Sequence, residues 1–129
     1  MDRFGSVWLE MDRRERAATI ANVEAVRDAV GPDVDLMIDV HGRLNVPTAI
    51  AIARALERYD LASIEEPAES IDALAEVRAK SPVPIAAGER FFEPERFLEA
   101  IAMRAGDYLQ PDVAHVGALS ETKEFSANK

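Results

Sequence analysis

The chain has 129 residues, of which 48% are hydrophobic and 30% are charged, and its formal net charge is −9. This length and apolar content predict a single globular domain over residues 1–129 and exclude a disordered chain. The negative charge argues against nucleic acid or an anionic membrane as a partner and favours a metal cation. Because the chain has no cysteine, carboxylates and the two histidines are the remaining candidate ligands.

We expect neither a membrane span nor an export signal in this sequence. No apolar run approaches the roughly 18 residues of a membrane span, and the start MDRFGSVWLEMDRR lacks the apolar region of a signal peptide. We therefore expect a cytoplasmic protein.

The first half of the chain alternates helical and strand patterns. Apolar residues at helical spacing predict a helix over 16–30, and the following GPD ends it. The next stretch, 33–42, alternates apolar and polar residues with the two-residue period of a strand. A second helix is predicted over 47–59, with a proline in its first turn, and LASIEE at 61–66 predicts a second strand.

The second half repeats the alternation. A third helix is predicted over 71–80 and a third strand over 83–89. The fourth helix is expected to open at Pro94 and to be capped by Gly106, because proline suits a first helical turn and glycine a C-terminal cap. The fourth strand follows at 107–112.

Strands that alternate with helices of this length predict parallel βα units. Each predicted strand ends in an acid, and the steps between these acids are 26, 24 and 23 residues: Asp39, Glu65, Glu89 and Asp112. This regularity, without a Gly-rich phosphate loop, favours a (β/α)-barrel of TIM type over a doubly wound, flavodoxin-like sheet. Four strands are about half of the usual eight. We therefore expect a partial barrel, a piece of a longer enzyme truncated at both ends.

Residue parity distinguishes the two acids of the motif IEEP. In LASIEE the residues Ala62 and Ile64 take the helix-facing positions, so Glu65 is expected to point into the barrel and Glu66 is not. The same counting puts four further residues on the interior side: Asp39, His41, Glu89 and Asp112.

Three of these acids suggest a metal site. Adjacent strands are roughly 4.8 Å apart, so Asp39, Glu65 and Glu89 are expected to converge, and a divalent ion would relieve their repulsion. An all-oxygen ligand set suits Mg²⁺. Any one of the acids would equally serve as a helix cap or a solvated loop residue, but three in register favour Mg²⁺.

The two histidines differ in their surroundings. His41 shares a face with Asp39, two residues before it, which favours a catalytic role over that of a satisfied polar residue. His115 lies beyond the fourth strand and is expected to be structural.

Four motifs, in this order and spacing, carry a family resemblance: DVHGR, IEEP, AAGER and LQPD. Together they resemble the enolase superfamily in its mandelate racemase/muconate lactonizing enzyme-like branch, and most of all acid-sugar dehydratases such as the galactonate dehydratases. The resemblance implies a (β/α)₇β barrel with a separate capping domain, and Mg²⁺ bound by Asp39, Glu65 and Glu89.

The resemblance also implies a reaction. The carboxylate of an aldonic acid such as galactonate would bind to Mg²⁺, a base would remove the proton on carbon 2, and the enediolate would be stabilised by the metal. His41 matches the general acid that protonates the hydroxyl leaving carbon 3, which gives a 2-keto-3-deoxy acid. Asp112 matches the residue that orients a catalytic histidine on the next strand.

Parts of the family pattern are not found in these 129 residues: the histidine base, a lysine-bearing strand and the capping domain. We expect the isolated chain to be inactive, and its open sheet edges to favour a homo-oligomer. Two alternatives remain open: a racemase, epimerase or cycloisomerase of the same superfamily, and a non-catalytic half-barrel module that binds a cation or pairs with itself.

Overall fold

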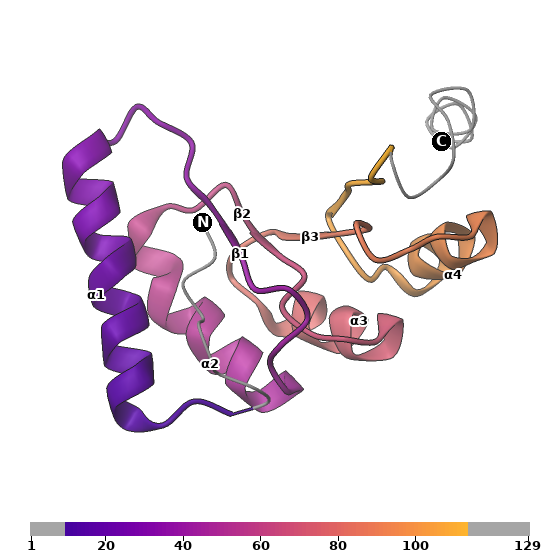
Figure 1. Cartoon of the computed structure of the whole chain (residues 1–129), viewed down its shortest axis with the longest axis horizontal. Helices are drawn as coiled ribbons and strands as arrows, with labels where there is room; N and C mark the ends of the chain where they lie inside the picture. Colours follow the sequence, from indigo (N-terminus) through magenta and orange to yellow (C-terminus); the bar gives the residue numbers. More distant parts are fainter. Residues whose placement is uncertain (1–9, 114–129) are drawn as a thin grey trace.

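A computed structural model describes residues 10–113 of the chain. In this part four strands form one parallel sheet in the order β1-β2-β3-β4, and a helix precedes each strand (Figure 1). The strands are β1 (Met37–Asp39), β2 (Ser63–Glu65), β3 (Ile85–Ala87) and β4 (Tyr108–Leu109). The helices are α1 (Arg13–Val30), α2 (Val46–Leu56) with the short 3₁₀ helix η1 (Glu57–Tyr59), α3 (Ile71–Lys80) and α4 (Pro94–Met103).

The order of the strands confirms a partial (β/α)-barrel of TIM type. Each strand pairs in parallel with the next one along the chain, whereas a doubly wound sheet would reverse its strand order at a switch point. The helices follow one another in an arc beside the sheet, with α1 packed on α2, α2 on α3 and α3 on α4 (Figure 1).

Side-chain caps decide where three helices begin. Asp12 accepts hydrogen bonds from the backbone of Arg14 and Glu15 in a capping box, so α1 begins three residues before the predicted Arg16. Asn45 caps α2 at Val46, and Ser70 caps α3 at the predicted residue.

The helix C-termini correct one prediction. Gly31 ends α1 as expected, with φ +77°. Gly106 does not cap α4, because the helix already ends at Met103 and Arg104 takes the left-handed conformation with φ +54°. Gly106 has a different requirement, since a Cβ there would lie 2.9 Å from the carbonyl oxygen of Tyr108.

The core lies between the helices and one face of the sheet. Ile38, Ile64 and Ile85 of the strands are 5% exposed or less, and burial of each such side chain contributes roughly 1.5–3 kcal/mol. The opposite face is open on the two edge strands, where Met37 of β1 is 53% and Tyr108 of β4 is 54% exposed. Among residues 10–113 no helix combines the length and apolar character needed to cross a bilayer.

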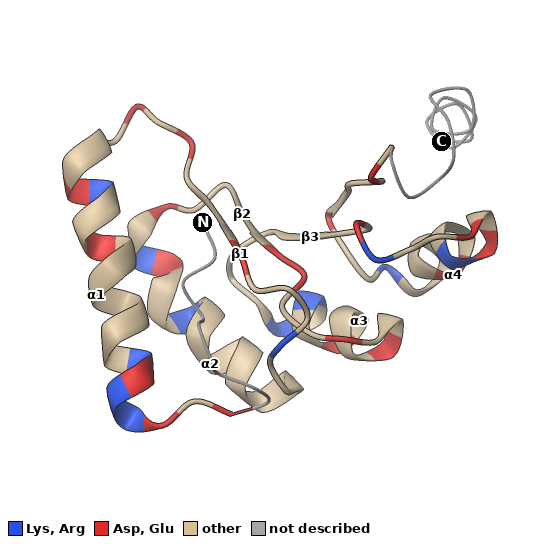
Figure 2. Cartoon of the chain, in the orientation of Figure 1, with Lys and Arg blue, Asp and Glu red and all other residues tan. Residues whose placement is uncertain are grey.

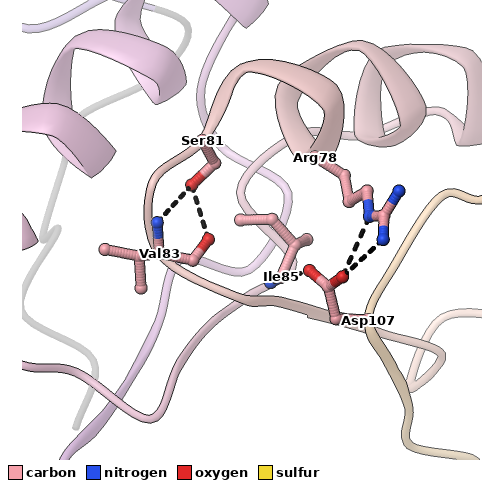
Figure 3. A network of polar contacts seen from close by, with 5 residues as sticks. All are labelled: Arg78, Ser81, Val83, Ile85 and Asp107. Atoms are coloured by element: carbon pink, nitrogen blue, oxygen red, sulfur yellow. Dashed lines mark hydrogen bonds and ion pairs between the residues drawn. The ribbon is translucent and has the colours of Figure 1, made fainter.

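The ends at which the strands begin are tied by a polar network (Figure 3). Asp107 accepts hydrogen bonds from the Arg78 guanidinium at 2.9 and 2.7 Å and from the Ile85 backbone N–H at 2.9 Å. The Ser81 hydroxyl accepts from the Val83 N–H and donates to its carbonyl oxygen. These bonds fix α3, the loop before β3 and the loop before β4 to one another.

Candidate metal centre

Asp39 and His41 form a close pair at the end of β1. One carboxylate oxygen of Asp39 accepts a hydrogen bond from the His41 backbone N–H at 2.9 Å, which is the geometry of an Asx turn. The other oxygen lies 2.5 Å from Nδ1 of the imidazole. His41 has φ +57°, so a turn and not strand alternation brings the two side chains together.

Glu89 joins this pair from the loop after β3. One ligand atom each from Asp39, His41 and Glu89 lies within 4.8 Å of the other two. Chain segments about 50 residues apart in the sequence thus bring two carboxylates and an imidazole to one spot. His41 is the most exposed of the three, and 43% of its side chain is accessible.

Glu65 lies in register with Asp39 on the neighbouring strand. Figure 2 shows acidic residues, in red, on both of these paired strands. Partial burial raises the pKa of Glu65, and the nearby carboxylates of Asp39 and Glu89 raise it further. Glu65 is not part of the group of three atoms within 4.8 Å, but it belongs to the same cluster of negative charge.

The donor set fits Mg²⁺. Three carboxylates of like sign gather at this end of the sheet, and the charges of Asp39 and Glu89 add to the effect of burial in raising the pKa of Glu65. A hard divalent cation with oxygen ligands would relieve this repulsion. Asp39, Glu65 and Glu89 are therefore the residues that would hold the ion, with His41 beside them.

Two predicted positions need correction. Glu89 and Asp112 do not end their strands, because β3 ends at Ala87 and β4 at Leu109. Gly88 has φ +139° and approaches the backbone of Gln110 so closely that a Cβ would lie 2.9 Å from its nitrogen. The chain turns there, so strand parity does not govern the direction of the Glu89 side chain.

Asp112 is partly buried in the segment after β4, and it is not a member of the group formed by Asp39, His41 and Glu89. His115 lies outside the described residues.

Glu66 is a site residue for which parity predicted no role. Its side chain is fully buried, and its Oε1 accepts a hydrogen bond from the Gly88 N–H at 2.7 Å. Burial raises the pKa of Glu66 to about 7, while the hydrogen bond from Gly88 and the charge of Arg90 oppose the rise. The sequence signal for Glu66 was the second acid of IEEP, because a carboxylate at a helix-facing position is expected to be buried.

Comparison with known families identifies the family of the chain. The family described as enolase C-terminal domain-like matches residues 1–127. The chain belongs to this family. D-galactonate dehydratase from Ralstonia nicotianae is 40% identical over 106 residues, which are 81% of this chain and 28% of the relative. o-Succinylbenzoate synthase from Thermobifida fusca is also 40% identical over 106 residues, 82% of this chain and 33% of the relative.

Solved structures give the same result for this enolase C-terminal domain-like chain. A mandelate racemase/muconate lactonizing enzyme-like protein from Rubrobacter xylanophilus matches with a TM-score of 0.90 and 44% identity, over 98% of this chain and 34% of that one. An enolase from Bradyrhizobium, solved with magnesium and mandelic acid, matches with a TM-score of 0.84 and 33% identity, over 98% of this chain and 36% of that one. The chain thus spans about a third of the length of these relatives.

Proposed function

We propose that this chain supplies the Mg²⁺ site and the proton donor of an acid-sugar dehydratase. The observation that carries the proposal is the convergence of Asp39, His41 and Glu89, whose ligand atoms lie within 4.8 Å of one another, beside Glu65 in register on the next strand. The likeness to D-galactonate dehydratase supports this choice of reaction. The magnesium in the matched enolase from Bradyrhizobium supports the choice of metal.

Each residue has a distinct part in the proposed reaction. Asp39, Glu65 and Glu89 would hold Mg²⁺, which when bound supplies the positive charge that eases proton removal next to a substrate carboxylate. Nδ1 of His41 is engaged by Asp39, which leaves Nε2 to donate a proton to the hydroxyl leaving carbon 3. Asp112 would orient a histidine base that acts on carbon 2.

The atoms balance as a loss of water. A proton leaves carbon 2 of an aldonic acid such as galactonate, and the hydroxyl of carbon 3 takes up a proton and departs as water. The remaining enol becomes a 2-keto-3-deoxy acid.

Calorimetric titration of the chain with Mg²⁺ tests the metal site. We expect binding by the wild-type chain and none by Asp39→Asn. Asp35→Asn is a matched control, because Asp35 is an exposed residue of the loop just before β1. A wild-type chain without affinity for Mg²⁺ would contradict the proposal and favour a non-catalytic module.

The reaction is tested on the protein expressed from its complete reading frame. With a panel of aldonic acids we expect a 2-keto-3-deoxy acid as the product, and we expect EDTA to abolish its formation. Turnover that persists after removal of the metal would refute the proposed chemistry.

A second reaction is favoured by one observation. o-Succinylbenzoate synthase has the same 40% identity to this chain as D-galactonate dehydratase, so the motifs are compatible with other reactions of the superfamily. A racemase, epimerase or cycloisomerase would require a second base, for which a Lys-x-Lys pair on the strand preceding α1 is the expected sign. Sequencing the complete reading frame decides between these alternatives.

A further inference from the structure

Glu66 links three strand ends. Its backbone N–H donates to the Ala86 carbonyl oxygen at 2.9 Å, and its own carbonyl oxygen accepts from the Gly42 N–H at 2.6 Å. Its side chain accepts from the Gly88 N–H at 2.7 Å. The residue has φ +43°, a conformation that a glutamate rarely adopts. The ends of β1, β2 and β3 therefore meet at one residue.

Arg90 reinforces the same junction. Its Nη1 lies 1.8 Å from the position that a Cβ on Gly42 would occupy, so the guanidinium packs directly on the bare Cα of this glycine. Nη2 lies 3.7 Å from the carboxylate of Glu69 in the loop after β2. The positive charge of Arg90 also acts on the carboxylate of Glu66.

We name Gly42, Glu66, Gly88 and Arg90 the support layer. Every member is the immediate chain neighbour of a residue of the metal centre. Gly42 follows His41, Glu66 follows Glu65, and Gly88 and Arg90 flank Glu89. Consecutive Cα atoms are about 3.8 Å apart across a rigid peptide, so a shift in the support layer moves the residues of the metal centre directly.

The support layer contains buried polar atoms that a layer serving only stability would not be expected to leave unpaired. Among residues 10–113, Oε2 of Glu66 and Nη1 of Arg90 are both buried without a hydrogen-bond partner. A buried polar atom left in this state destabilises the folded chain, and apolar residues of similar volume often stabilise better than buried charges. The cost is incurred directly behind the carboxylates, where spacing matters most.

We propose that Glu66 and Arg90 are positioning residues that set the spacing of the metal-binding carboxylates without contacting the metal or the substrate. The inference rests on the proposed function, because it assumes that the carboxylates bind Mg²⁺. Partners behind metal ligands typically change metal affinity about 10-fold to 100-fold when they are replaced.

The first test replaces Arg90 with methionine and measures the dissociation constant of Mg²⁺ by calorimetry, together with the melting temperature in EDTA. Arg78→Met is the matched control, since both arginine side chains are 35% exposed and pair with a carboxylate, but Arg78 lies where the strands begin. We expect Arg90→Met to bind Mg²⁺ about 10-fold to 100-fold more weakly. Arg78→Met is expected to lower the melting temperature and leave the dissociation constant unchanged.

The second test reaches the same contact from the other side and does not depend on the folding of Arg90→Met. Gly42→Ala introduces a methyl group into the space of the guanidinium. Gly31→Ala controls for backbone strain, because Gly31 has φ +77° against +68° for Gly42 but has no atom within 4 Å of its Cβ position. We expect weaker Mg²⁺ binding from Gly42→Ala alone.

Glu66→Gln keeps the acceptor for Gly88 and removes the charge, so a small effect on stability with a loss of Mg²⁺ affinity would separate positioning from folding.

The outcomes distinguish the two proposals. If wild type binds Mg²⁺ and Asp39→Asn does not, unchanged affinity in Arg90→Met and Gly42→Ala overturns the positioning role and leaves the proposed function intact. Absence of binding by the wild-type chain overturns both.

Discussion

The two ends of the sheet differ in how completely their polar groups are paired. Where the strands begin, Arg27 donates hydrogen bonds to four carbonyl oxygens, and Asp107 accepts from both Arg78 and Ile85. Where the strands end, buried atoms of Glu66, Arg90 and Gln110 have no hydrogen-bond partner among the described residues. The end at which the strands begin is therefore the end whose polar groups stabilise the fold.

The difference follows the division of labour in (β/α)-barrels, in which the carboxyl ends of the strands carry function and the opposite ends carry stability. Carboxylates of like charge and left-handed turns at His41 and Glu66 are unfavourable on their own. They are tolerated because the network around Asp107 and the buried core hold the sheet together. The comparison predicts that substitutions at the two ends affect different measurements.

Asp39→Asn is expected to have the largest effect at the site. Loss of a charged ligand should weaken Mg²⁺ binding by more than about 100-fold, which corresponds to about 2.7 kcal/mol or more. The melting temperature in EDTA should stay the same or rise, because one of three repelling carboxylates is removed. Calorimetry and thermal unfolding measure the two quantities, and a parallel loss of both would break the comparison.

The pH dependence of stability tests Glu66. Its pKa is about 7 in the folded chain against 4.5 ordinarily, so the folded state binds the proton more tightly than the unfolded state. The stability from this group is therefore complete below pH 4.5 and is lost as the pH rises through about 7. In EDTA we expect the free energy of unfolding to fall by up to about 3 kcal/mol between pH 4.5 and pH 8.

Glu66→Gln should remove this part of the pH dependence in urea unfolding, whereas Glu95→Gln, at an exposed position of α4, should keep it. Identical pH profiles for wild type and Glu66→Gln would show that the buried carboxylate does not titrate in this range.

Asp107→Ala should give the reverse pattern to Asp39→Asn. The substitution removes the acceptor of the partly buried Ile85 N–H and of the Arg78 guanidinium. We expect a loss of about 2 kcal/mol in the free energy of unfolding and an unchanged dissociation constant for Mg²⁺. A change in affinity as large as the change in stability would mean that the two ends are not independent.

Lys80→Ala should have the smallest effect. The ion pair of Lys80 with Glu76 spans one helical turn at 2.6 Å, and both side chains are about half exposed. Such pairs contribute roughly 0.3–0.5 kcal/mol, so urea unfolding should give Lys80→Ala nearly the same free energy of unfolding as wild type. A loss above about 1 kcal/mol would indicate a contribution beyond the exposed pair.

Much of the fold was predictable because local signals and packing agree. The helix at 71–80 was predicted at its observed bounds, since Ser70 supplies a cap and its apolar residues recur at helical spacing. The strands were predicted too long: the pattern at 33–42 contains only three residues of β1. Alternation reports burial, whereas strand length depends on backbone pairing, which the Asx turn at Asp39 ends.

The site was predictable as a set of residues but not as a geometry. The spacing of acids placed Asp39, Glu65 and Glu89 at neighbouring strand ends, and the register of Asp39 with Glu65 agrees. Glu89 lies with Asp39 as parity predicted, but it comes there through the turn at Gly88, which depends on the approach of Gln110 from a distant segment, and not through strand alternation. The contact of Arg90 with Gly42 was missed for the same reason.

The sequential order of the sheet has a consequence for how the chain is made. Each strand pairs with the one synthesised just before it, so every new βα unit meets its docking surface already emerged from the ribosome. Assembly can then proceed from the N-terminus unit by unit. The loop bearing Glu89 arrives after β1 and β2, and its docking would complete the proposed cation site while translation is still under way.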